Sequence, residues 1–229
     1  MKRDGTLFGV GVGPGDPELM TFKAARILRE CDVIAIPSRD RNECFAFRIA
    51  SEAVPEILRK PVLEISLPMT RNMEEREKAY NTGSDLLCRV LSEGKNAAFL
   101  TIGDPTVYST FCYILEKVAA RNFSTVIIPG VTSFCAAAAA LSMPLCTDRE
   151  ELHIIPSHGS YERTLAYSGT KVFMKGDLSR LTETLSEHNM DVCAVENCGT
   201  REEKQYRSLD DIPADAGYYT VIIAKEKKL

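Results

Sequence analysis

The chain has 229 residues, of which 45% are hydrophobic and 26% charged, a composition typical of a globular protein with a buried core. Its formal net charge of -4 excludes an overall basic field that would hold nucleic acid or an anionic membrane. The sequence contains no Trp and few other aromatic residues, which argues against a platform for base stacking. We therefore expect neither nucleic acid nor a membrane among its partners.

The first half of the sequence alternates predicted strands with predicted helices. Glycines interrupt the apolar stretch near the N-terminus, so we interpret it as a strand and a turn rather than a signal peptide, and we expect a cytoplasmic protein. The predicted strands cover residues 6–13, 32–37, 62–67, 96–102 and 124–128. The predicted helices cover residues 16–31, 43–58 and 72–92, and two more end near residues 120 and 141. This alternation predicts βαβ units in a mostly parallel sheet, with ligands beyond the carboxyl ends of the strands.

The composition changes near residues 146–150, and a second α/β unit is predicted beyond that point. Its predicted strands lie near residues 152–156, 171–175, 191–196 and 218–224. The charged segment 201–212 has the pattern of a hairpin. We therefore predict an α/β protein of two domains, an N-terminal one over residues 1–147 and a C-terminal one over residues 148–229.

Eight cysteines are spread along the chain, and none of them forms a Cys-x-x-Cys pair. Only three histidines are present to complete a metal site. Several of the cysteines stand in apolar surroundings, which favours small buried thiols in a reducing compartment over disulfides or zinc. We expect no metal in this protein.

The glycine-rich turn after the first predicted strand is the first segment that indicates a ligand. Residues 9–16 read GVGVGPGD, and glycines allow the backbone to turn sharply and to approach a ligand closely. The spacing does not fit the G-x-G-x-x-G dinucleotide motif, because Pro14 or Asp16 occupies the last glycine position. A P-loop would need Gly-Lys-Ser/Thr, which is absent. A tight turn alone would need fewer glycines, so ligand contact is the better interpretation.

Two further turns follow predicted strands in the same half. Residues 103–110 read GDPTVYST, where Asp104 is also a candidate helix cap, and residues 129–133 read PGVTS, where Thr132 and Ser133 are candidate caps. Because all three turns lie at strand carboxyl ends of one predicted sheet, they predict a single cleft lined by backbone.

These segments resemble the tetrapyrrole (corrin and porphyrin) methylases. The resemblance lies in GVGPGDPELMT at residues 11–21, in the Gly103-Asp104-Pro105 turn and in PGVTS at residues 129–133. It implies two α/β domains with S-adenosylmethionine held in the cleft between them, and a homodimer. Within the family, LPMT at residues 67–70 and FLTIGDPTVYST at residues 99–110 are similar to the branch that methylates precorrin-2 or its cobalt complex at carbon 20 in cobalamin biosynthesis.

The resemblance also implies which residues contact the cofactor and the substrate. The implied cofactor contacts are Pro14, Gly103, Asp104, Thr106, Val107, Thr132, Ser133, Met174, Cys198 and Thr220. Asp104 is the expected polar group near the reacting atoms, aiding proton removal, and Tyr108 is expected to orient the substrate. Basic side chains should meet the substrate carboxylates, and the candidates are Arg39, Arg41, Arg71 and Lys175. His153 and His158 flank a predicted strand end within reach of a substrate, although ordinary surface roles fit them as well.

The expected reaction is direct displacement, in which a ring carbon attacks the sulfonium methyl and the protein aligns the reactants and excludes water. Alternatives within the same fold are uroporphyrinogen III methylation and methylation of RNA or protein. An alternative of another class is a non-enzymatic tetrapyrrole-binding regulator. The sequence leaves open whether the substrate already carries cobalt.

Overall fold

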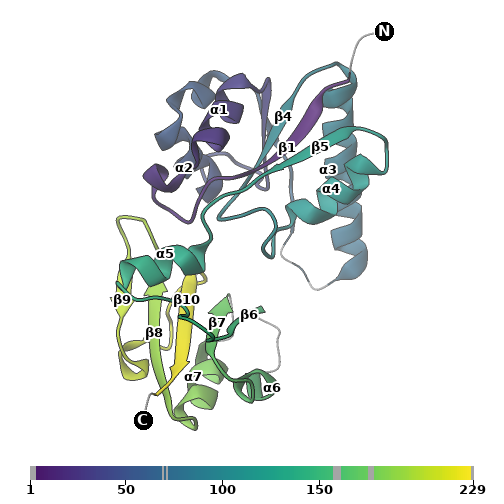
Figure 1. Cartoon of the computed structure of the whole chain (residues 1–229). Coiled ribbons are helices and arrows are strands. Elements are labelled where there is room, and N and C mark those ends of the chain that lie inside the picture. Colours follow the sequence, from purple (N-terminus) through teal and green to yellow (C-terminus); the bar gives the residue numbers. More distant parts are fainter. Residues whose placement is uncertain (1–3, 69, 71, 157–160, 175–177, 228–229) are drawn as a thin grey trace. The chain divides into compact units, whose positions relative to one another are not determined.

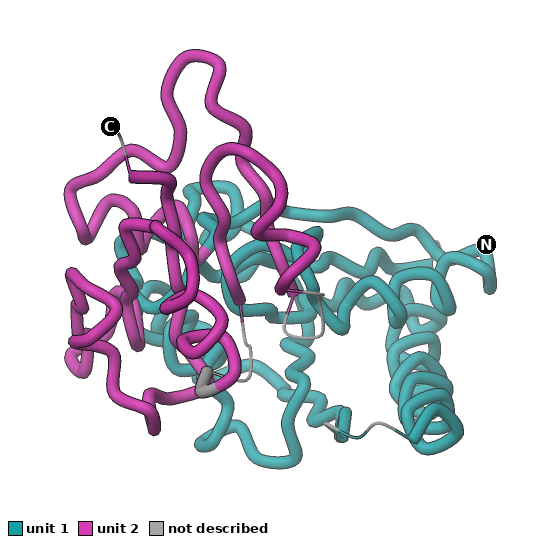
Figure 2. The backbone as a smooth tube through the Cα atoms, turned by 90° about the horizontal axis from the view of Figure 1, so that it is seen from below, with its two compact units in different colours: residues 1–132 teal, residues 133–229 magenta. Residues whose placement is uncertain are grey.

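The computed structural model describes residues 4–68, 70, 72–156, 161–174 and 178–227 (Figure 1). The chain divides into two compact units, residues 1–132 and residues 133–229, which Figure 2 distinguishes by colour. Each unit contains one five-stranded sheet accompanied by helices. The predicted α/β class with two sheet-containing units is confirmed.

The sheet of the first unit is parallel in every strand pair, as the alternation of strands and helices predicts. Its strand order is β3-β2-β4-β1-β5, so β1 lies between β4 and β5. The strands are β1 (Thr6–Gly11), β2 (Val33–Ile36), β3 (Val62–Glu64), β4 (Ala97–Thr101) and β5 (Ser124–Ile128). β2 and β4 are buried along their whole length, which explains why both are almost continuously apolar.

Helices cover both faces of this sheet and fill two separate hydrophobic cores. One core joins α1 (Phe22–Glu30) and α2 (Phe45–Ala53) to one face, and the other joins α3 (Met73–Ser92) and α4 (Phe111–Ala119) to the opposite face. Side chains of β4 alternate between the two cores, with Leu100 in the first and Phe99 in the second.

Two of the predicted helices are divided in the structure. The segment predicted at 16–31 consists of the short 3-10 helix η1 (Pro17–Leu19) and then α1, because Met20 is extended and the hydroxyl of Thr21 accepts the amide of Ala24 at 3.1 Å as a new cap. The segment predicted at 43–58 is divided at Pro55, where α2 gives way to the 3-10 helix η2 (Pro55–Arg59), since proline cannot continue a helix in its interior.

The sheet of the second unit is mixed, with the order β6-β7-β10-β8-β9. Only β6 and β7 pair in parallel, and the other three pairs are antiparallel. The strands are β6 (Leu152–Pro156), β7 (Thr170–Met174), β8 (Met190–Glu196), β9 (Lys204–Tyr206) and β10 (Thr220–Glu226). The helices of this unit are α5 (Ser133–Ala140), α6 (Tyr161–Leu165) and α7 (Leu178–Ser186), and a 3-10 helix, η3, covers Leu209–Asp211.

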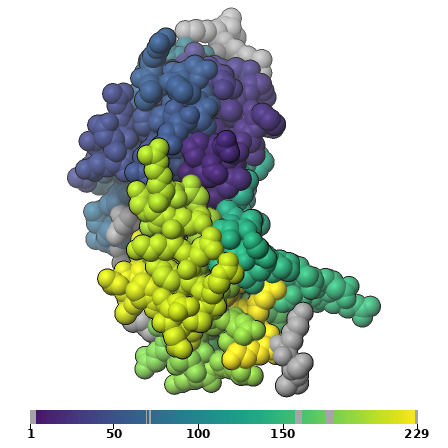
Figure 3. Space-filling view, turned by 90° about the vertical axis from the view of Figure 1, so that its left-hand side faces the viewer, coloured from purple at the N-terminus to yellow at the C-terminus, as the bar shows by residue number. Residues whose placement is uncertain are grey.

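The hairpin pattern of residues 201–212 is confirmed, because β9 lies inside that segment and pairs antiparallel with β8. The short strand β9 was not predicted as a strand. Its three residues are polar or only partly buried, so the segment carries no apolar signal of its own. The space-filling view places the yellow-green residues that follow β8 at the surface of this unit (Figure 3).

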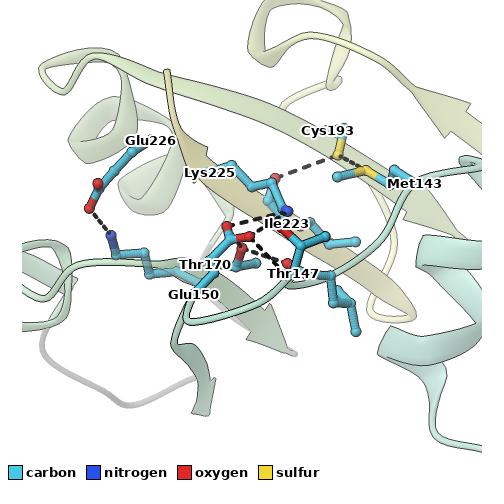
Figure 4. A network of polar contacts seen from close by, with 10 residues as sticks. Met143, Thr147, Glu150, Thr170, Cys193, Ile223, Lys225 and Glu226 are labelled. Carbon is cyan, nitrogen blue, oxygen red and sulfur yellow. Dashed lines mark hydrogen bonds and ion pairs between the residues drawn. The ribbon is translucent and has the colours of Figure 1, made fainter. Parts of the chain in front are cut away.

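The division between the units falls after Thr132, whereas the sequence predicted it after residue 147. The difference arises from α5, whose small alanine side chains lie against β8 and β10. The segment after α5 is also fixed to the second sheet by polar contacts (Figure 4). The hydroxyl of Thr170 lies 2.6 Å from the carbonyl of Leu145 and 2.7 Å from the carboxylate of Glu150, and Lys225 forms an ion pair with Glu150 at 3.3 Å. These contacts make residues 133–147 part of the second unit.

Candidate functional site

The three glycine-bearing turns of the first unit meet at one edge of its sheet. They follow β1, β4 and β5, which are neighbouring parallel strands, so their carboxyl ends lie side by side. The amide of Val12 donates to the carbonyl of Thr101 at 3.0 Å, and the amide of Gly103 donates to the carbonyl of Gly13 at 2.8 Å. Gly13 and Gly103 both have positive φ, +83° and +69°, which favours glycine. The predicted gathering of the three turns is confirmed.

Glycines in these turns are required by the close contact of the turns with one another. A Cβ on Gly11 would lie 2.5 Å from the carbonyl oxygen of Gly103 and 2.7 Å from the amide nitrogen of Gly130. A Cβ on Gly130 would lie 2.2 Å from the same carbonyl oxygen of Gly103. These obstacles are backbone atoms, which cannot move aside as a flexible side chain can. The glycines therefore build a compact junction of three backbone segments, which we call the glycine junction.

Asp104 ties two parts of the glycine junction together. Its side chain is only 8% exposed. Oδ1 accepts the amide of Thr106 at 2.8 Å and the hydroxyl of Thr106 at 2.5 Å, and Oδ2 accepts the amide of Gly130 at 3.0 Å. Burial, the largest influence, raises the pKa of Asp104, but the bonds from Thr106 and Gly130 lower it further than burial raises it. The net pKa is below its usual value, so this side chain is a carboxylate that accepts protons weakly.

The turn after Asp104 holds Tyr108 in an unusual conformation. Tyr108 has φ +47°, a left-handed value that is uncommon for a bulky residue, and its side chain is 50% exposed. The turn is fixed on both sides of it, because the amide of Val107 donates to the carbonyl of Asp104 and Ser109 Oγ lies 2.8 Å from Thr101 Oγ1. Strained backbone of this kind is found at functional sites more often than elsewhere.

The segment after β5 brings a polar atom without a partner to the same edge of the sheet. The hydroxyl oxygen of Thr132 is buried, and among the residues that the structure describes it has no hydrogen-bond partner. A buried hydroxyl without a partner costs free energy and is rare in folded proteins. Ser133 is the first residue of α5 and belongs to the second unit. Pro14, in the turn after β1, is buried.

The residues implied as contacts in the second unit lie at one end of its sheet. Met174 ends β7, Cys198 follows β8, and Thr220 begins β10. Met174 pairs with Val221 across β7 and β10, and the amide of Asn197 donates to the carbonyl of Tyr219 at 3.1 Å. All three implied contacts are more than 90% buried. The structure thus places them together within the second unit.

Similarity to known proteins covers almost the whole chain. The sequence pattern of the tetrapyrrole (corrin/porphyrin) methylases matches residues 6–212. The chain belongs to this family. The cobalamin biosynthesis protein CobIJ of Mycobacterium tuberculosis is 33% identical over 96% of this chain, and the match covers 46% of that protein. This tetrapyrrole methylase therefore spans about half the length of that relative.

Two other relatives are similar in length to this tetrapyrrole methylase. The probable cobalt-precorrin-2 C(20)-methyltransferase of Methanocaldococcus jannaschii is 35% identical over 79% of this chain and 75% of its own. The cobalt-precorrin-2 C(20)-methyltransferase of Salmonella typhimurium is 28% identical over 98% of both chains.

Solved structures of tetrapyrrole methyltransferases share the fold. A cobalt precorrin-4 methyltransferase superposes with a TM-score of 0.75 at 21% identity, covering 96% of this chain and 94% of its own. The uroporphyrin-III C-methyltransferase of Thermus thermophilus, solved in complex with S-adenyl homocysteine, gives a TM-score of 0.72 at 21% identity. The superposition covers 97% of this chain and 98% of that structure's chain.

One buried carboxylate of this tetrapyrrole methylase was missed by the sequence reasoning. Glu196, at the end of β8, accepts the amide of Gly217 at 2.8 Å and the hydroxyl of Tyr206 at 2.8 Å. Burial raises the pKa of Glu196, and the bond from Gly217, followed by that from Tyr206, lowers it to a net value below normal. Burial and the carboxylate together raise the pKa of Tyr206 to about 12. The available signal was the acidic residue that ends a largely apolar strand.

The candidate carboxylate-binding residues are only partly described. Arg39 and Arg41 follow β2 at the carboxyl edge of the first sheet, where Arg39 Nε donates to Ser66 Oγ at 2.7 Å and the amide of Arg41 donates to Glu64 at 3.2 Å. Both are exposed. Arg71, Lys175 and His158 lie outside the described residues. His153 stacks on Tyr167 and lies 2.9 Å from the carbonyl of Ser168.

All eight cysteines lie in the described ranges; Cys31, Cys44 and Cys198 are buried, whereas Cys135 and Cys146 are exposed. Within the described ranges, no group of three or more His, Cys, Asp or Glu residues is arranged to hold a metal ion. Among the residues that the structure describes, none of the helices combines the length and the apolar character that crossing a bilayer requires.

Proposed function

We propose that this tetrapyrrole methylase transfers a methyl group from S-adenosylmethionine to carbon 20 of precorrin-2 or of its cobalt complex, a step of cobalamin biosynthesis. The names of the two relatives of similar length support the substrate and the position. The observation that carries the proposal is the glycine junction, in which three backbone turns with the family's sequence pattern meet at one sheet edge.

The residues at this edge fit the cofactor chemically. The buried hydroxyl of Thr132 lacks a partner in the described structure, so a bound polar group would satisfy it. S-adenosylmethionine, when bound, supplies a methyl group already activated by its sulfonium, so the protein needs to provide position and a dry environment rather than a strong nucleophile. We assign its binding to Pro14, Gly103, Asp104, Thr106, Val107, Thr132, Ser133, Met174, Cys198 and Thr220.

We assign Asp104 a positioning role. Both of its carboxylate oxygens already accept hydrogen bonds from the chain, and its lowered pKa makes it a weak base. The carboxylate instead fixes the turn at 103–106 against Gly130. Tyr108, strained and half exposed beside that turn, is the residue that we assign to substrate orientation.

We further propose that the protein acts in the cytoplasm as a homodimer and does not bind nucleic acid. The net charge of -4 supports the last point, because the protein has no overall positive field to attract a polyanion. Sedimentation of the purified protein would test the dimer, since a monomer at micromolar concentration would contradict it.

Turnover with a panel of substrates tests the proposed function. The purified protein is incubated with S-adenosylmethionine carrying a 13C-labelled methyl group and with uroporphyrinogen III, precorrin-2 or cobalt-precorrin-2. The proposal expects a labelled product from precorrin-2 or its cobalt complex, with the methyl carbon assigned to position 20 by NMR. If uroporphyrinogen III is the only one of the three substrates that gives a labelled product, the protein belongs to another branch of the family. Binding of the tetrapyrroles without any labelled product would indicate a regulator.

A further inference from the structure

An arginine of the first unit rests against a pair of stacked tyrosines. The rings of Tyr80 (α3) and Tyr113 (α4) stack with centroids 4.9 Å apart and an interplanar angle of 9°. The guanidinium carbon of Arg76 lies 5.8 Å and 5.6 Å from these two centroids, and its Nε donates to the hydroxyl of Tyr80 at 3.3 Å. Contacts of a guanidinium with two aromatic rings hold the side chain in a defined orientation.

This cluster lies beyond the same edge of the sheet as the glycine junction. α3 ends beside the start of β1, where the amide of Gly5 donates to the carbonyl of Leu91 at 2.8 Å, so α3 begins at the opposite, carboxyl edge. Gly83 is level with that edge, because a Cβ on it would lie 2.6 Å from the side chain of Ile65, the residue after β3. Arg76 precedes Gly83 by about two helical turns, or about 10 Å along the axis.

The first turn of α4 connects the cluster to the glycine junction. α3 and α4 pack side by side (Figure 1). The thiol of Cys112, next to Tyr113 in sequence, donates to the carbonyl of Pro105 at 3.3 Å. Pro105 follows Asp104 directly, so the stacked tyrosines are attached to the turn that carries the implied cofactor contacts.

The charge of Arg76 is not neutralised within the described structure. Two other basic residues nearby have acidic partners on α3, since Lys117 of α4 lies 2.5 Å from Glu77 and Arg121, just after α4, lies 2.6 Å from Asp85. Among the described residues, no carboxylate lies within 4.0 Å of Arg76. Two side chains that contact Arg76 are exposed to solvent: Tyr113 is 45% exposed, and Met73, whose sulfur approaches Arg76 at 3.9 Å, is 71% exposed.

We propose that Arg76, oriented by the Tyr80–Tyr113 stack, binds a carboxylate of the tetrapyrrole substrate and so positions the ring for methyl transfer. This inference rests on the proposed function, because it assigns a substrate contact to the same reaction. A guanidinium forms two parallel hydrogen bonds with a carboxylate, and one that is already held in place loses little side-chain entropy on binding. Tyr80 is buried beneath the stack, whereas the ring of Tyr113, which is 45% exposed, offers an apolar surface to the macrocycle beside that charge.

Steady-state kinetics of Arg76→Gln and Arg76→Lys test the inference in the full-length protein, with the tetrapyrrole that the wild type methylates as substrate. Loss of a charge-assisted contact is expected to raise KM roughly 10- to 100-fold in Arg76→Gln, while kcat changes little. Arg76→Lys keeps the charge without the planar fork, so its KM should lie between those of the wild type and Arg76→Gln. Added salt should raise the KM of the wild type more than that of Arg76→Gln, because salt screens the lost contact.

Arg180→Gln is the matched control. Arg180 also lies over a tyrosine ring, 5.7 Å from the centroid of Tyr161, but its guanidinium is paired with Glu162 at 3.1 Å. We expect its KM for the tetrapyrrole to equal that of the wild type. Calorimetric titration with S-adenosylhomocysteine should give wild-type affinity for both glutamine variants, which separates a substrate contact from damage to the cofactor site.

The outcomes distinguish this inference from the proposed function. If the wild type methylates none of the tetrapyrroles, the proposed function fails. If the wild type methylates precorrin-2 or its cobalt complex and Arg76→Gln keeps the wild-type KM and salt dependence, the inference alone is overturned. If Arg76→Gln loses thermal stability and S-adenosylhomocysteine affinity together, Arg76 has a structural role in packing α3 against α4, which also overturns the inference.

Discussion

Asp104→Asn removes a charge that joins two turns of the glycine junction while it preserves the shape of the side chain. The asparagine oxygen can still accept the bonds that Thr106 now makes to Oδ1. The amide nitrogen then faces the N–H of Gly130, which now donates to Oδ2 at 3.0 Å, and two donors repel each other. One partly buried backbone N–H is therefore left without an acceptor.

The size of the effect follows from that one lost acceptor. A fully buried donor without a partner costs about 1–3 kcal/mol, and the N–H of Gly130 is partly buried, so the free energy of unfolding of the first unit should fall by an amount toward the lower end of that range. Urea unfolding at pH 7 measures the difference between wild type and variant. Asp16→Asn is the matched control, because among the described residues the side chain of Asp16 accepts only the amide of Glu18, in an exposed cap where asparagine is equally suitable.

The pH dependence gives the prediction a second test. The pKa of Asp104 is lower in the folded protein than the usual value of about 3.9. The stabilising contribution of the ionised carboxylate is therefore present at neutral pH and is lost as the pH falls through the pKa that Asp104 has in the folded protein. The stability difference between wild type and Asp104→Asn should therefore be constant from pH 7 to about pH 5 and shrink below about pH 4. Equal stability of the two proteins at pH 7 would refute the assigned role of Asp104.

Three other variants probe the same edge of the sheet. Gly130→Ala should destabilise the first unit by about 1–3 kcal/mol in urea unfolding, because its Cβ would lie 2.2 Å from the carbonyl oxygen of Gly103, and wild-type stability would contradict the described packing. Thr132→Val should raise stability by about 1 kcal/mol, since it removes a buried hydroxyl without a described partner, and should weaken S-adenosylhomocysteine binding roughly tenfold in calorimetry. If Thr132→Val binds S-adenosylhomocysteine as tightly as the wild type does, the hydroxyl of Thr132 does not contact the cofactor. Tyr108→Asn should keep stability within about 1 kcal/mol, because asparagine tolerates φ +47°, and should raise the KM for the tetrapyrrole. Unchanged KM would exclude Tyr108 from substrate orientation.

The meeting of the three turns could be predicted from the sequence because each turn follows an apolar strand in a pattern of alternating strands and helices. Parallel strands with helical crossovers place all their carboxyl ends at one edge, so local patterns fixed a long-range arrangement. The sequence did not reveal why glycine is required at these positions. Gly11 and Gly130 are 119 positions apart by number, and only the folded backbone reveals that each occupies space that the other turn needs.

Other features depended on contacts that no local pattern encodes. Residues 133–147 carry no signal that assigns them to the second unit, since α5 consists mainly of small alanines that lie against β8 and β10, and the segment after it is held by Thr170 and Lys225, later in the chain. The spacing of Arg76 and Tyr80 is the i, i+4 spacing of helical neighbours and was visible in the sequence. Their partner Tyr113 comes from another helix, so the stacked pair could not be predicted.

Cofactor binding at the glycine junction is the claim on which the rest depends, and selective labelling tests it directly. The chain contains 14 glycines, so a protein labelled with 15N-glycine gives a simple amide spectrum that can be titrated with S-adenosylhomocysteine. We predict that the amide resonances of Gly13, Gly103 and Gly130 shift, whereas the amide resonance of Gly94, just after the C-terminal end of α3, does not. Binding that leaves the three junction resonances unmoved would place the cofactor elsewhere and contradict the account.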